Sequence, residues 1–360
     1  MNAGHFAVVV GINRYPDIGI LQHAQKDAAD FHAWVTSESG GGVPPEQAFL
    51  IIADLAPETK RRDAQPTAAR ILNALDECIA NNTDYLKGRM ADWPTTRLYF
   101  FGAGHGIAPG PRDAALLAAN ASTKYLNEHV SCASLLDYFS RVQHFKELII
   151  FADCCRTEER LATPAPPPWT DDSLNRGNVR KFFAVGARFF QRSFERLEGT
   201  PDEQRGYFTR ALLDGLNGEA LDSNDPTAPV KASILKGTIT EHMRRNSRAR
   251  YPLRPLEPDF LDEGVGEIYF GPARTVPPIP TRYPVQIRVE DQTVRELAAS
   301  DGKTNGALVS MRWENAPTSL FRSDLPVGLW EAIPLTGNPP TPSPRNWFFK
   351  VTEGTNDYNF

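Results

Sequence analysis

The fold is decided by Leu148-Ile149-Ile150-Phe151-Ala152-Asp153-Cys154-Cys155-Arg156, an apolar run that ends abruptly in polar and reactive residues. About fifty positions earlier, Arg97-Leu98-Tyr99-Phe100-Phe101-Gly102-Ala103-Gly104-His105-Gly106 repeats this pattern and ends in a histidine between glycines. Both runs have the length of a buried strand. Because neighbouring parallel strands end at one edge of a sheet, these two would bring a thiol and an imidazole together.

A thiol and an imidazole at one sheet edge are the groups that nucleophilic catalysis requires. The thiolate is the nucleophile, and a nearby imidazole can take the proton of the thiol. Successive side chains near a strand end point to opposite faces, so only one of Cys154 and Cys155 would face His105. A Gly-His-Gly turn alone is usually structural, and it is the cysteine after the second strand that favours catalysis.

Apolar runs alternate with amphipathic stretches along the first 270 residues. Strands are expected at residues 6–11, 48–52, 97–102, 147–152, 181–187 and 267–270, with a short apolar run at 114–119. Helices are expected at residues 21–35, 66–79, 132–142, 207–216 and 230–245. Strands that are apolar on both faces and separated by helices predict an α/β fold with a mostly parallel sheet covered on both sides.

A proline-rich segment marks a domain boundary. Residues 276–283 contain Pro277, Pro278 and Pro280, and such a segment forms a stiff, extended connector. We therefore predict a first domain at 1–275, a linker at 276–283 and a small all-β domain at 284–360. Strand-like runs in the last region lie at residues 283–289, 307–313, 329–333 and 347–351, separated by turn residues.

Composition limits the classes of partner and compartment. The chain has 360 residues, of which 41% are hydrophobic and 23% charged, and a net charge of -5. It has no Lys/Arg-rich run to suggest a nucleic-acid partner and no apolar run of about 18 residues to suggest a membrane span. The N-terminus lacks the pattern of a secretory signal. Four cysteines without a CxxC pair argue against a disulfide framework and a zinc site, and a cytoplasmic location is expected.

The segment from about residue 5 to 270 resembles the caspase–metacaspase family of cysteine peptidases. The first strand and its turn, Ala7-Val8-Val9-Val10-Gly11-Ile12-Asn13, resemble those of the family, and Gln25-Lys26-Asp27-Ala28 resembles its Asn-Asp-Ala segment. Gly104-His105-Gly106 resembles the segment of the catalytic His, and Asp153-Cys154-Cys155-Arg156 resembles the Asp-Ser-Cys-His of metacaspases. Gly206-Tyr207-Phe208-Thr209 matches the late Gly-X-Phe-Thr helix start.

Three positions depart from the metacaspase pattern. Ala103 replaces the usual Ser before the catalytic His, Cys154 replaces the Ser of Asp-Ser-Cys-His, and Arg156 replaces its His. Alignment with Asp-X-Cys favours Cys155 as the nucleophile, and Cys154 would then be a small packing residue. The departures also leave an alternative open, in which the chain is a catalytically silent caspase-like scaffold or protein-binding module.

The resemblance implies a cysteine endopeptidase of clan CD, of the prokaryotic caspase-like or orthocaspase type. It assigns the nucleophile to Cys155 and the proton partner to His105, and the backbone N–H groups of Gly106 and Cys155 would form the oxyanion hole. The resemblance also implies that Asp27 and Asp153 line a P1 pocket for Arg or Lys, because paired carboxylates bind a guanidinium strongly. The alternative for Asp27 is a solvated acid on a helix face.

The resemblance also bears on regulation and partners. Self-cleavage would fall near Arg176 or Arg180, in a Pro-rich stretch at 157–180 that is expected to be a long mobile loop. Some metacaspases need calcium, but a solvated loop is the preferred interpretation of Asp171-Asp172, and no metal or cofactor is predicted. Substrates would be proteins or peptides, a regulator or target would bind the C-terminal β domain, and the pathway would be stress, cell death or defence.

Overall fold

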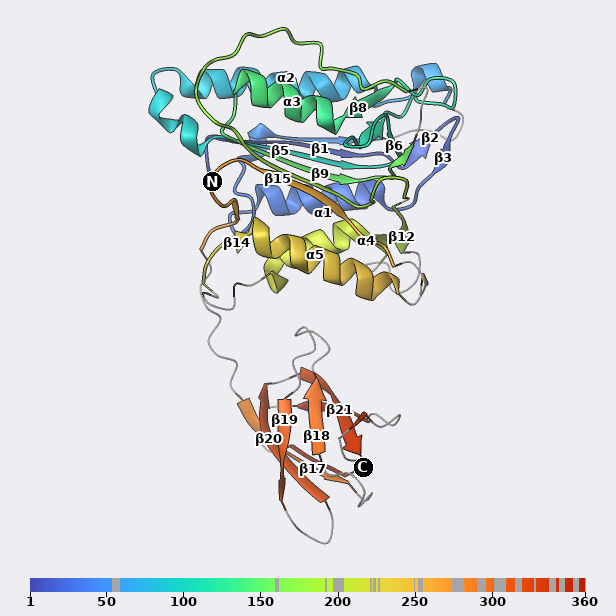
Figure 1. Cartoon of the computed structure of the whole chain (residues 1–360), viewed down its shortest axis with the longest axis vertical. Coiled ribbons are helices and arrows are strands. Elements are labelled where there is room, and N and C mark those ends of the chain that lie inside the picture. Colours follow the sequence, from blue (N-terminus) through green and yellow to red (C-terminus); the bar gives the residue numbers. More distant parts are fainter. Residues whose placement is uncertain are drawn as a thin grey trace. The chain divides into compact units, whose positions relative to one another are not determined.

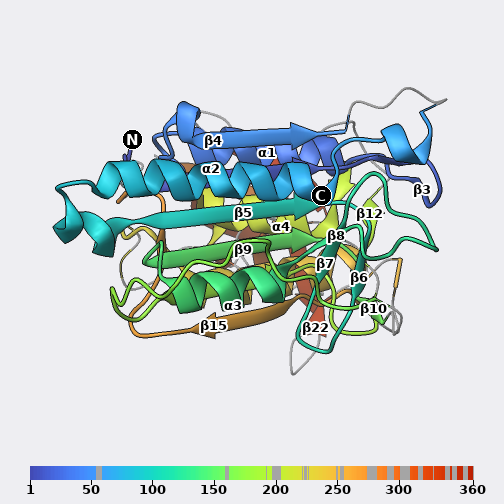
Figure 2. The ribbon, with the colours of Figure 1, turned by 90° about the horizontal axis from the view of Figure 1, so that it is seen from above.

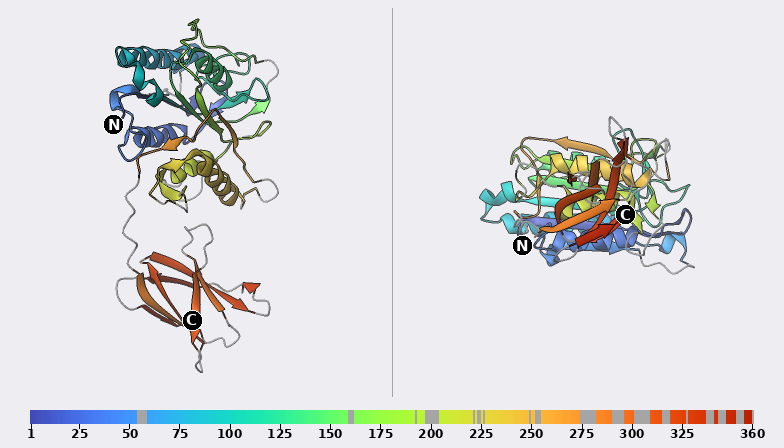
Figure 3. Two further views of the ribbon diagram at one scale, coloured as in Figure 1. Left: turned by 60° about the vertical axis from the view of Figure 1, so that its left-hand side comes forward. Right: turned by 90° about the horizontal axis from the view of Figure 1, so that it is seen from below.

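The computed structural model divides the chain into two compact units, Met1–Arg274 and Thr275–Phe360. Figure 1 and Figure 3 show an α/β unit followed by a β unit. The structure describes residues 1–53, 59–158, 162–191, 193–196, 204–220, 222, 225, 227–248, 250–251, 255–273, 282–289, 296–300, 309–314, 319–326, 328–336, 341–342, 347–351 and 356–359. Residues 276–281 of the predicted linker lie outside the described residues.

The first unit is built on a six-stranded sheet in the order β15-β11-β9-β5-β1-β4. Its strands are β1 (His5–Gly11), β4 (Ala48–Ile52), β5 (Arg97–Ala103), β9 (Glu147–Asp153), β11 (Arg180–Val185) and β15 (Asp259–Glu263). All neighbouring strands are parallel except β15, which runs antiparallel to β11. The predicted fold class, an α/β fold with a mostly parallel sheet, is confirmed.

Helices cover both faces of this sheet. The helices α2 (Ala68–Leu86) and α3 (Cys132–Val142) lie on one face, and α1 (Ala24–Thr36), α4 (Tyr207–Asp214) and α5 (Ala232–Ser247) lie on the other (Figure 1). Successive side chains of a strand alternate between these layers. Phe100 packs in the core beneath α2 and α3, whereas Phe101 packs beside Phe31 of α1. Burial on both faces explains why the central strands are continuous apolar runs.

Short elements complete the first unit. A four-stranded sheet in the order β10-β6-β7-β8 lies beyond the carboxyl ends of β5 and β9 (Figure 2). Its strands are β6 (Gly106–Ala108), β7 (Ala115–Leu117), β8 (His129–Ser131) and β10 (Thr157–Glu158). The two-stranded pairs are β2 (Arg14–Tyr15) with β3 (Gly19–Ile20), β12 (Glu195–Arg196) with β13 (Arg205–Gly206), and β14 (Val230–Lys231) with β16 (Tyr269–Phe270). Short 3₁₀ turns span Pro45–Gln47, Arg61–Asp63 and Met90–Thr95, and a π-turn spans Gly215–Glu219.

The edge strand β15 was not predicted from the sequence. Its sequence, Asp-Phe-Leu-Asp-Glu, is too acidic to resemble a buried strand. The three acids are nevertheless paired with basic side chains of the neighbouring segments: Asp259 with Arg156, Asp262 with Arg180, and Glu263 with Lys181. Charged side chains are common on edge strands, where they discourage pairing with another chain.

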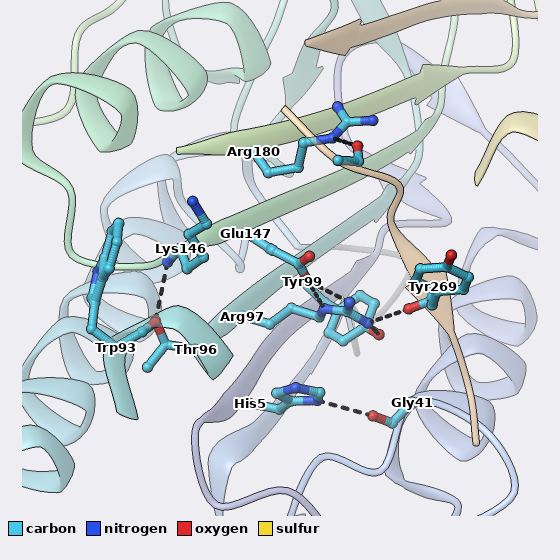
Figure 4. A network of polar contacts seen from close by, with 11 residues as sticks. His5, Gly41, Trp93, Thr96, Arg97, Tyr99, Lys146, Glu147, Arg180 and Tyr269 are labelled. Carbon is cyan, nitrogen blue, oxygen red and sulfur yellow. Dashed lines mark hydrogen bonds and ion pairs between the residues drawn. The ribbon is translucent and has the colours of Figure 1, made fainter. Parts of the chain in front are cut away.

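A buried polar network holds the amino ends of the central strands. The guanidinium of Arg97 at the start of β5 donates to the carboxylate of Glu147 at the start of β9 and, at 2.9 Å, to the Tyr99 hydroxyl. It also donates to the carbonyl of Tyr269 in β16 at 2.9 Å, as Figure 4 shows. The network therefore ties the end of the first unit to the amino edge of the sheet.

The second unit contains β17 to β24 (Figure 3). The strands are β17 (Arg282–Val289), β18 (Glu296–Ser300), β19 (Val309–Glu314), β20 (Ser319–Pro326), β21 (Gly328–Thr336), β22 (Thr341–Pro342), β23 (Trp347–Val351) and β24 (Asn356–Asn359). Pairing is antiparallel except between β17 and β24, which are parallel. Val285, Ile287 and Val289 alternate into its core. The all-β class was predicted, whereas the strands β18, β20, β22 and β24 were not.

Within the part of the chain that the structure describes, no helix has the length and apolar character needed to cross a lipid bilayer.

Candidate active site

The ends of β5 and β9 are aligned in register. Ala103 at the end of β5 pairs with Asp153 at the end of β9, and the Gly104 N–H donates to the Asp153 carbonyl at 3.2 Å. His105 and Cys155 each follow these paired residues by two positions. Both side chains line one pocket beyond the carboxyl edge of the sheet, where Figure 2 shows the two strands ending.

Tyr15, which sequence reasoning missed, holds the backbone of His105. Its buried hydroxyl accepts the His105 N–H at 2.9 Å and donates to the Leu117 carbonyl at 3.2 Å. A Cβ on Gly104 would lie 2.4 Å from this hydroxyl oxygen, so only glycine leaves room for it. The first glycine of Gly-His-Gly therefore admits the tyrosine that fixes the histidine.

The imidazole of His105 is partly buried beside the Tyr15 ring, with ring centroids 4.8 Å apart. Burial lowers the pKa of His105, and the neighbouring Glu195 carboxylate opposes that shift. Among the described residues, its Nε2 atom has no hydrogen-bond partner. The neutral imidazole is therefore favoured at neutral pH, in the form that can accept a proton.

The second glycine of the motif, Gly106, packs against both cysteines. A Cβ at this position would lie 2.6 Å from the Cys154 sulfur and 2.7 Å from the Cys155 carbonyl oxygen. Both distances are below van der Waals contact, so a side chain here would displace the segment that carries Cys155. Glycine is required for the close approach of β6 to the end of β9.

The N–H of Gly106 points away from β7. The Leu117 N–H donates to the His105 carbonyl at 2.9 Å, and the next residues, Gly106 and Leu116, are opposite each other in the antiparallel ladder. Since hydrogen-bonded and non-hydrogen-bonded pairs alternate in such a ladder, Gly106 and Leu116 form a non-hydrogen-bonded pair. The Gly106 N–H is therefore directed to the other side of β6, where β10 follows Cys155.

The two adjacent cysteines lie in different environments. Cys154 is 1% exposed, and burial raises the pKa of its thiol well above the usual range. Cys155 is partly exposed and lines the pocket, and its thiol donates to the Ser193 carbonyl at 3.6 Å. A buried thiol with a raised pKa forms little thiolate and is therefore a poor nucleophile. Cys155, in contrast, is accessible.

The pocket has a volume of about 240 Å³ and combines acidic and aromatic side chains with a thiol and an imidazole. Its walls come from the strand ends, the start of α1, the loop with β12 and the segment after α5. The lining residues are Leu21, Ala24, Asp27, Ala103, Gly104, His105, Asp153, Cys155, Ser193, Phe194, Glu195, Gly206, Arg250 and Tyr251.

Asp153 lies at the end of β9 and is 8% exposed. Its Oδ1 accepts the Ser193 hydroxyl at 2.6 Å, and its Oδ2 accepts the N–H and hydroxyl of Thr209 at 3.1 and 2.7 Å. Burial raises the pKa of Asp153, although these hydrogen bonds act in the opposite direction. The Thr of the Gly-X-Phe-Thr helix start therefore orients the pocket acid.

Asp27 lies in the first turn of α1 and is 2% exposed, so the alternative of a solvated helix-face acid is wrong. Its Oδ2 accepts the Gly206 N–H at 3.0 Å, while its buried Oδ1 has no hydrogen-bond partner among the described residues. Burial and the nearby Asp153 carboxylate raise the pKa of Asp27 well above its usual range. The structure brings both sequence-predicted acids into the pocket.

A third acid, Glu195, also lines the pocket and was not predicted. Its carboxylate accepts the backbone N–H groups of Gln22 at 2.9 Å and His23 at 2.7 Å, immediately before α1. Glu195 pairs with Gly206 in the β12–β13 ladder. The sequence gives no periodic signal here, since β12 has only two residues and the side-chain partners of Glu195, Gln22 and His23, are more than 170 positions away along the chain.

Arg156, which follows Cys155, is 2% exposed. Its guanidinium donates to the carbonyls of Asp113 at 3.0 Å and Pro111 at 2.8 Å, and pairs with Asp259 at 2.6 Å. Its backbone N–H donates to the Gln191 carbonyl at 2.9 Å. Arg156 therefore points into the protein and connects the segment after β9 to three neighbouring segments.

The expected long mobile loop at 157–180 is partly incorrect. Arg180 begins β11, is 7% exposed, and its guanidinium bonds Asp262 and the Glu263 carbonyl. Arg176 lies at the amino end of the sheet, where its N–H donates to the Gln143 side chain at 2.6 Å. Burial in a strand removes Arg180 as an accessible cleavage point, whereas Arg176 remains in irregular structure.

The Asp171-Asp172 pair lies in this segment beside α3. The Asp171 carboxylate accepts the Tyr138 hydroxyl at 2.6 Å and lies 3.2 Å from His144 Nε2. Across the described residues, no group of three or more His, Cys, Asp or Glu side chains could hold a metal ion.

No family model matches this chain. The chain is similar to a probable protease of a Desulfuromonadales bacterium, with 26% identity over 233 residues. The aligned region covers 59% of this chain and 26% of the relative, so the chain spans about a quarter of the length of that protein.

Proposed function

We propose that the chain is a cysteine endopeptidase that cleaves peptide bonds after Arg, or Lys, with Cys155 as nucleophile and His105 as proton carrier. The observation that carries this proposal is a single pocket lined by Cys155, His105 and the two buried acids Asp27 and Asp153. The similarity to a probable protease supports peptide-bond hydrolysis. The partly exposed thiol of Cys155 in the same pocket as His105 supports the choice of nucleophile.

The reaction begins when the thiol of Cys155 attacks the scissile carbonyl carbon. The proton of the thiol passes to the neutral imidazole of His105, whose Nε2 is unpartnered among the described residues. A C–S bond forms and the carbonyl oxygen becomes an oxyanion. The N–H of Gly106, which points away from β7, and that of Cys155 donate to this oxygen.

Collapse of the tetrahedral intermediate breaks the C–N bond. The imidazolium of His105 gives its proton to the leaving amine, and the acyl group stays on Cys155 as a thioester. Water then attacks the thioester carbonyl while His105 takes a proton from it. Departure of the Cys155 sulfur, which regains the proton from His105, releases the carboxylic acid and restores the enzyme.

The acids of the pocket favour a cationic P1 side chain. Asp27 and Asp153 are both buried, and a guanidinium or ammonium between them would neutralise their charge. An acidic P1 side chain would be repelled by the same groups. A preference for basic P1 residues follows.

The scaffold alternative gains no support from the three departures from the metacaspase pattern. Ala103 and Cys154 are buried packing residues, and Arg156 points away from the pocket into carbonyl and carboxylate partners. Each departure leaves Cys155 and His105 at the pocket. Partner recruitment by the C-terminal β unit, a cytoplasmic location and a role in stress, cell death or defence remain predictions from the sequence.

Peptides with Arg, Lys or Asp at P1 test this function. We expect cleavage of the Arg and Lys peptides, loss of cleavage in Cys155→Ala, and near-normal cleavage in the matched control Cys154→Ser, which restores the serine usual in metacaspases. Faster cleavage of the Asp peptide would contradict the P1 assignment. Equal loss in the two cysteine variants, with both folded by circular dichroism, would contradict the nucleophile assignment.

A further inference from the structure

We propose that the strand β4 pairs edge to edge with β4 of a second copy of this chain, so that the sheets of the two first units join into one continuous sheet. The two copies are related by a two-fold axis, and their β4 strands run antiparallel. No residue of β4 lines the pocket of Cys155 and His105, so this inference is independent of the proposed function.

The strand β4 is the last strand of the main sheet, and one of its edges is free. Within the part of the chain that the structure describes, β4 pairs only with β1. Figure 2 shows it at the outer edge of the sheet. Leu50 and Ile52 of this strand are 39% and 44% exposed. Such an edge presents backbone N–H and C=O groups that another strand can bind.

Alternate residues of β4 face β1 and the free edge. The Ala53 N–H, directly after the strand, donates to the Gly11 carbonyl of β1 at 3.2 Å. In a parallel ladder the N–H and C=O of one residue point to the same side, and the next residue points to the other. Ile51 therefore bonds β1 as Ala53 does, and Leu50 and Ile52 direct their N–H and C=O groups outward.

Ala48 also faces outward, but its backbone groups are already engaged. Its N–H donates to the Pro45 carbonyl of the preceding 3₁₀ turn, and its carbonyl lies 3.4 Å from Nε2 of His32 in α1. Among the described residues of β4, Leu50 and Ile52 thus provide the outward groups that remain for a partner. An antiparallel pair with Leu50 of each copy opposite Ile52 of the other uses all of these groups.

The same register buries the exposed side chains of the strand. Leu50 is opposite Val9 of β1, whose side chain packs in the layer of α1, so Leu50 and Ile52 lie on this face of the sheet. Opposite residues of an antiparallel pair carry their side chains on one face, about 5 Å apart. Pairing therefore covers the two aliphatic side chains of each copy with those of the other.

The absence of charge at this edge identifies a second copy as the occupant. The sequence of β4 is Ala-Phe-Leu-Ile-Ile. The neighbouring side chains of α1 are also neither acidic nor strongly basic: Gln25 bonds the Ala53 carbonyl, His32 lies beside Ala48, and the exposed Ala29 lies between them. Two copies with a net charge of -5 repel each other, and like charges opposite each other destabilise paired strands, so self-pairing requires an uncharged edge.

The other edge of the sheet has the opposite character. Its strand β15 carries Asp259, Asp262 and Glu263, and a two-fold pair of β15 strands would bring acids together. Charged side chains of this kind protect an edge strand from pairing with another chain. The strand β4 lacks this protection, which is expected of an edge that is covered by a partner.

Light scattering after size-exclusion chromatography of the full chain tests the pairing. Over a range of about 1 to 100 μM, the mass should rise towards twice that of the single chain. A wild-type protein that stays monomeric at about 100 μM would overturn the inference, even if another protein binds the edge of β4.

Ile52→Lys should raise the dissociation constant of the dimer at least about a hundredfold, because each lysine would be buried against Leu50 of the other copy. Circular dichroism checks that the variant is folded. Val265→Lys is the matched control, since Val265 is 84% exposed and lies in the turn after β15. It should leave the dissociation constant unchanged. A folded Ile52→Lys variant that dimerises as tightly as wild type would contradict the role of β4.

Cross-linking provides a second measurement that does not depend on the lysine variant. Leu50→Cys and Ile52→Cys are each prepared with Cys155→Ala, which removes the partly exposed native thiol. After the two proteins are mixed, oxidation should link them through a disulfide, since opposite residues of paired strands are close enough for this bond. Leu50→Cys mixed with Val265→Cys should remain unlinked. Failure of the first mixture to cross-link would overturn the proposed pairing.

Discussion

Gly106 and Cys154 are in such close contact that a Cβ on the glycine would lie 2.6 Å from the cysteine sulfur. This contact ties the strand that follows His105 to the segment that carries Cys155. The positions of His105 and Cys155 are therefore coupled by the packing of Gly106 against Cys154.

The first prediction concerns this glycine. Gly106→Ala should lower kcat/KM by about a hundredfold or more, because a displacement near 1 Å at a catalytic group has an effect of this size. Gly110→Ala is the matched control, since a Cβ there meets no atom within 4 Å. Steady-state kinetics with an Arg peptide measures both. Normal activity of Gly106→Ala would contradict the packing described for this site.

The second prediction concerns the reactivity of the thiols. Iodoacetamide should modify Cys155 in the native protein and leave the other three cysteines unmodified. Cys78, Cys132 and Cys154 are at most 1% exposed, and burial raises the pKa of each. Peptide mass spectrometry after brief labelling locates the adduct. Modification of Cys154 at the rate of Cys155 would refute the proposed division of roles.

The third prediction concerns Asp27 and pH. The pKa of Asp27 is raised in the folded protein, so the folded state binds more protons than the unfolded state between the two pKa values. The contribution of Asp27 to the free energy of unfolding therefore falls as pH rises from its pKa in the unfolded state to its pKa in the folded state. Asp27→Asn should increase the free energy of unfolding at pH 7 by about 1 kcal/mol while weakening cleavage after Arg.

Urea denaturation at pH 7 and at pH 4 checks this prediction. The gain in stability should be larger at pH 7, because near pH 4 Asp27 in the native protein is already protonated. The KM for an Arg peptide should rise in wild type as pH falls, since protonation removes the charge that binds the P1 cation. If Asp27→Asn lowered the free energy of unfolding at pH 7, the conclusion that buried Asp27 destabilises the folded protein at this pH would be contradicted.

The fourth prediction concerns Tyr15. Tyr15→Phe removes the hydroxyl that joins the His105 N–H to the Leu117 carbonyl. The free energy of unfolding should fall by about 1–2 kcal/mol, and kcat should fall about tenfold or more with little change in KM. Tyr99→Phe removes a buried hydroxyl at the opposite end of β5 and should destabilise without changing kcat.

The strands and helices around the central sheet could be predicted from the sequence because the strands are buried on both faces. The strand at β4 and the helix α3 have the bounds expected from periodicity, and β5 and β9 each extend one residue beyond the expected bounds. Strands that are covered on both faces show their burial as continuous apolar runs. The convergence of two such runs at one sheet edge follows from parallel pairing alone.

The residues that sequence reasoning missed have contacts that no local pattern records. Glu195 meets Gln22 and His23, more than 170 positions away along the chain, and Tyr15 meets His105 across 90 positions. The strand β15 was missed for another reason: an edge strand is only partly buried, and its acids are paired with side chains of neighbouring segments. Such contacts depend on the folded arrangement rather than on periodicity.

The position of Arg176 constrains how the chain could process itself. This residue lies beside the start of β9, whereas Cys155 follows its end, and a seven-residue strand spans about 20 Å. A cut after Arg176 in the folded protein must therefore be made by a second molecule. The rate of such a cut would rise with the square of the protein concentration. Dilute protein would then stay intact, and a local rise in its concentration would start cleavage after Arg176.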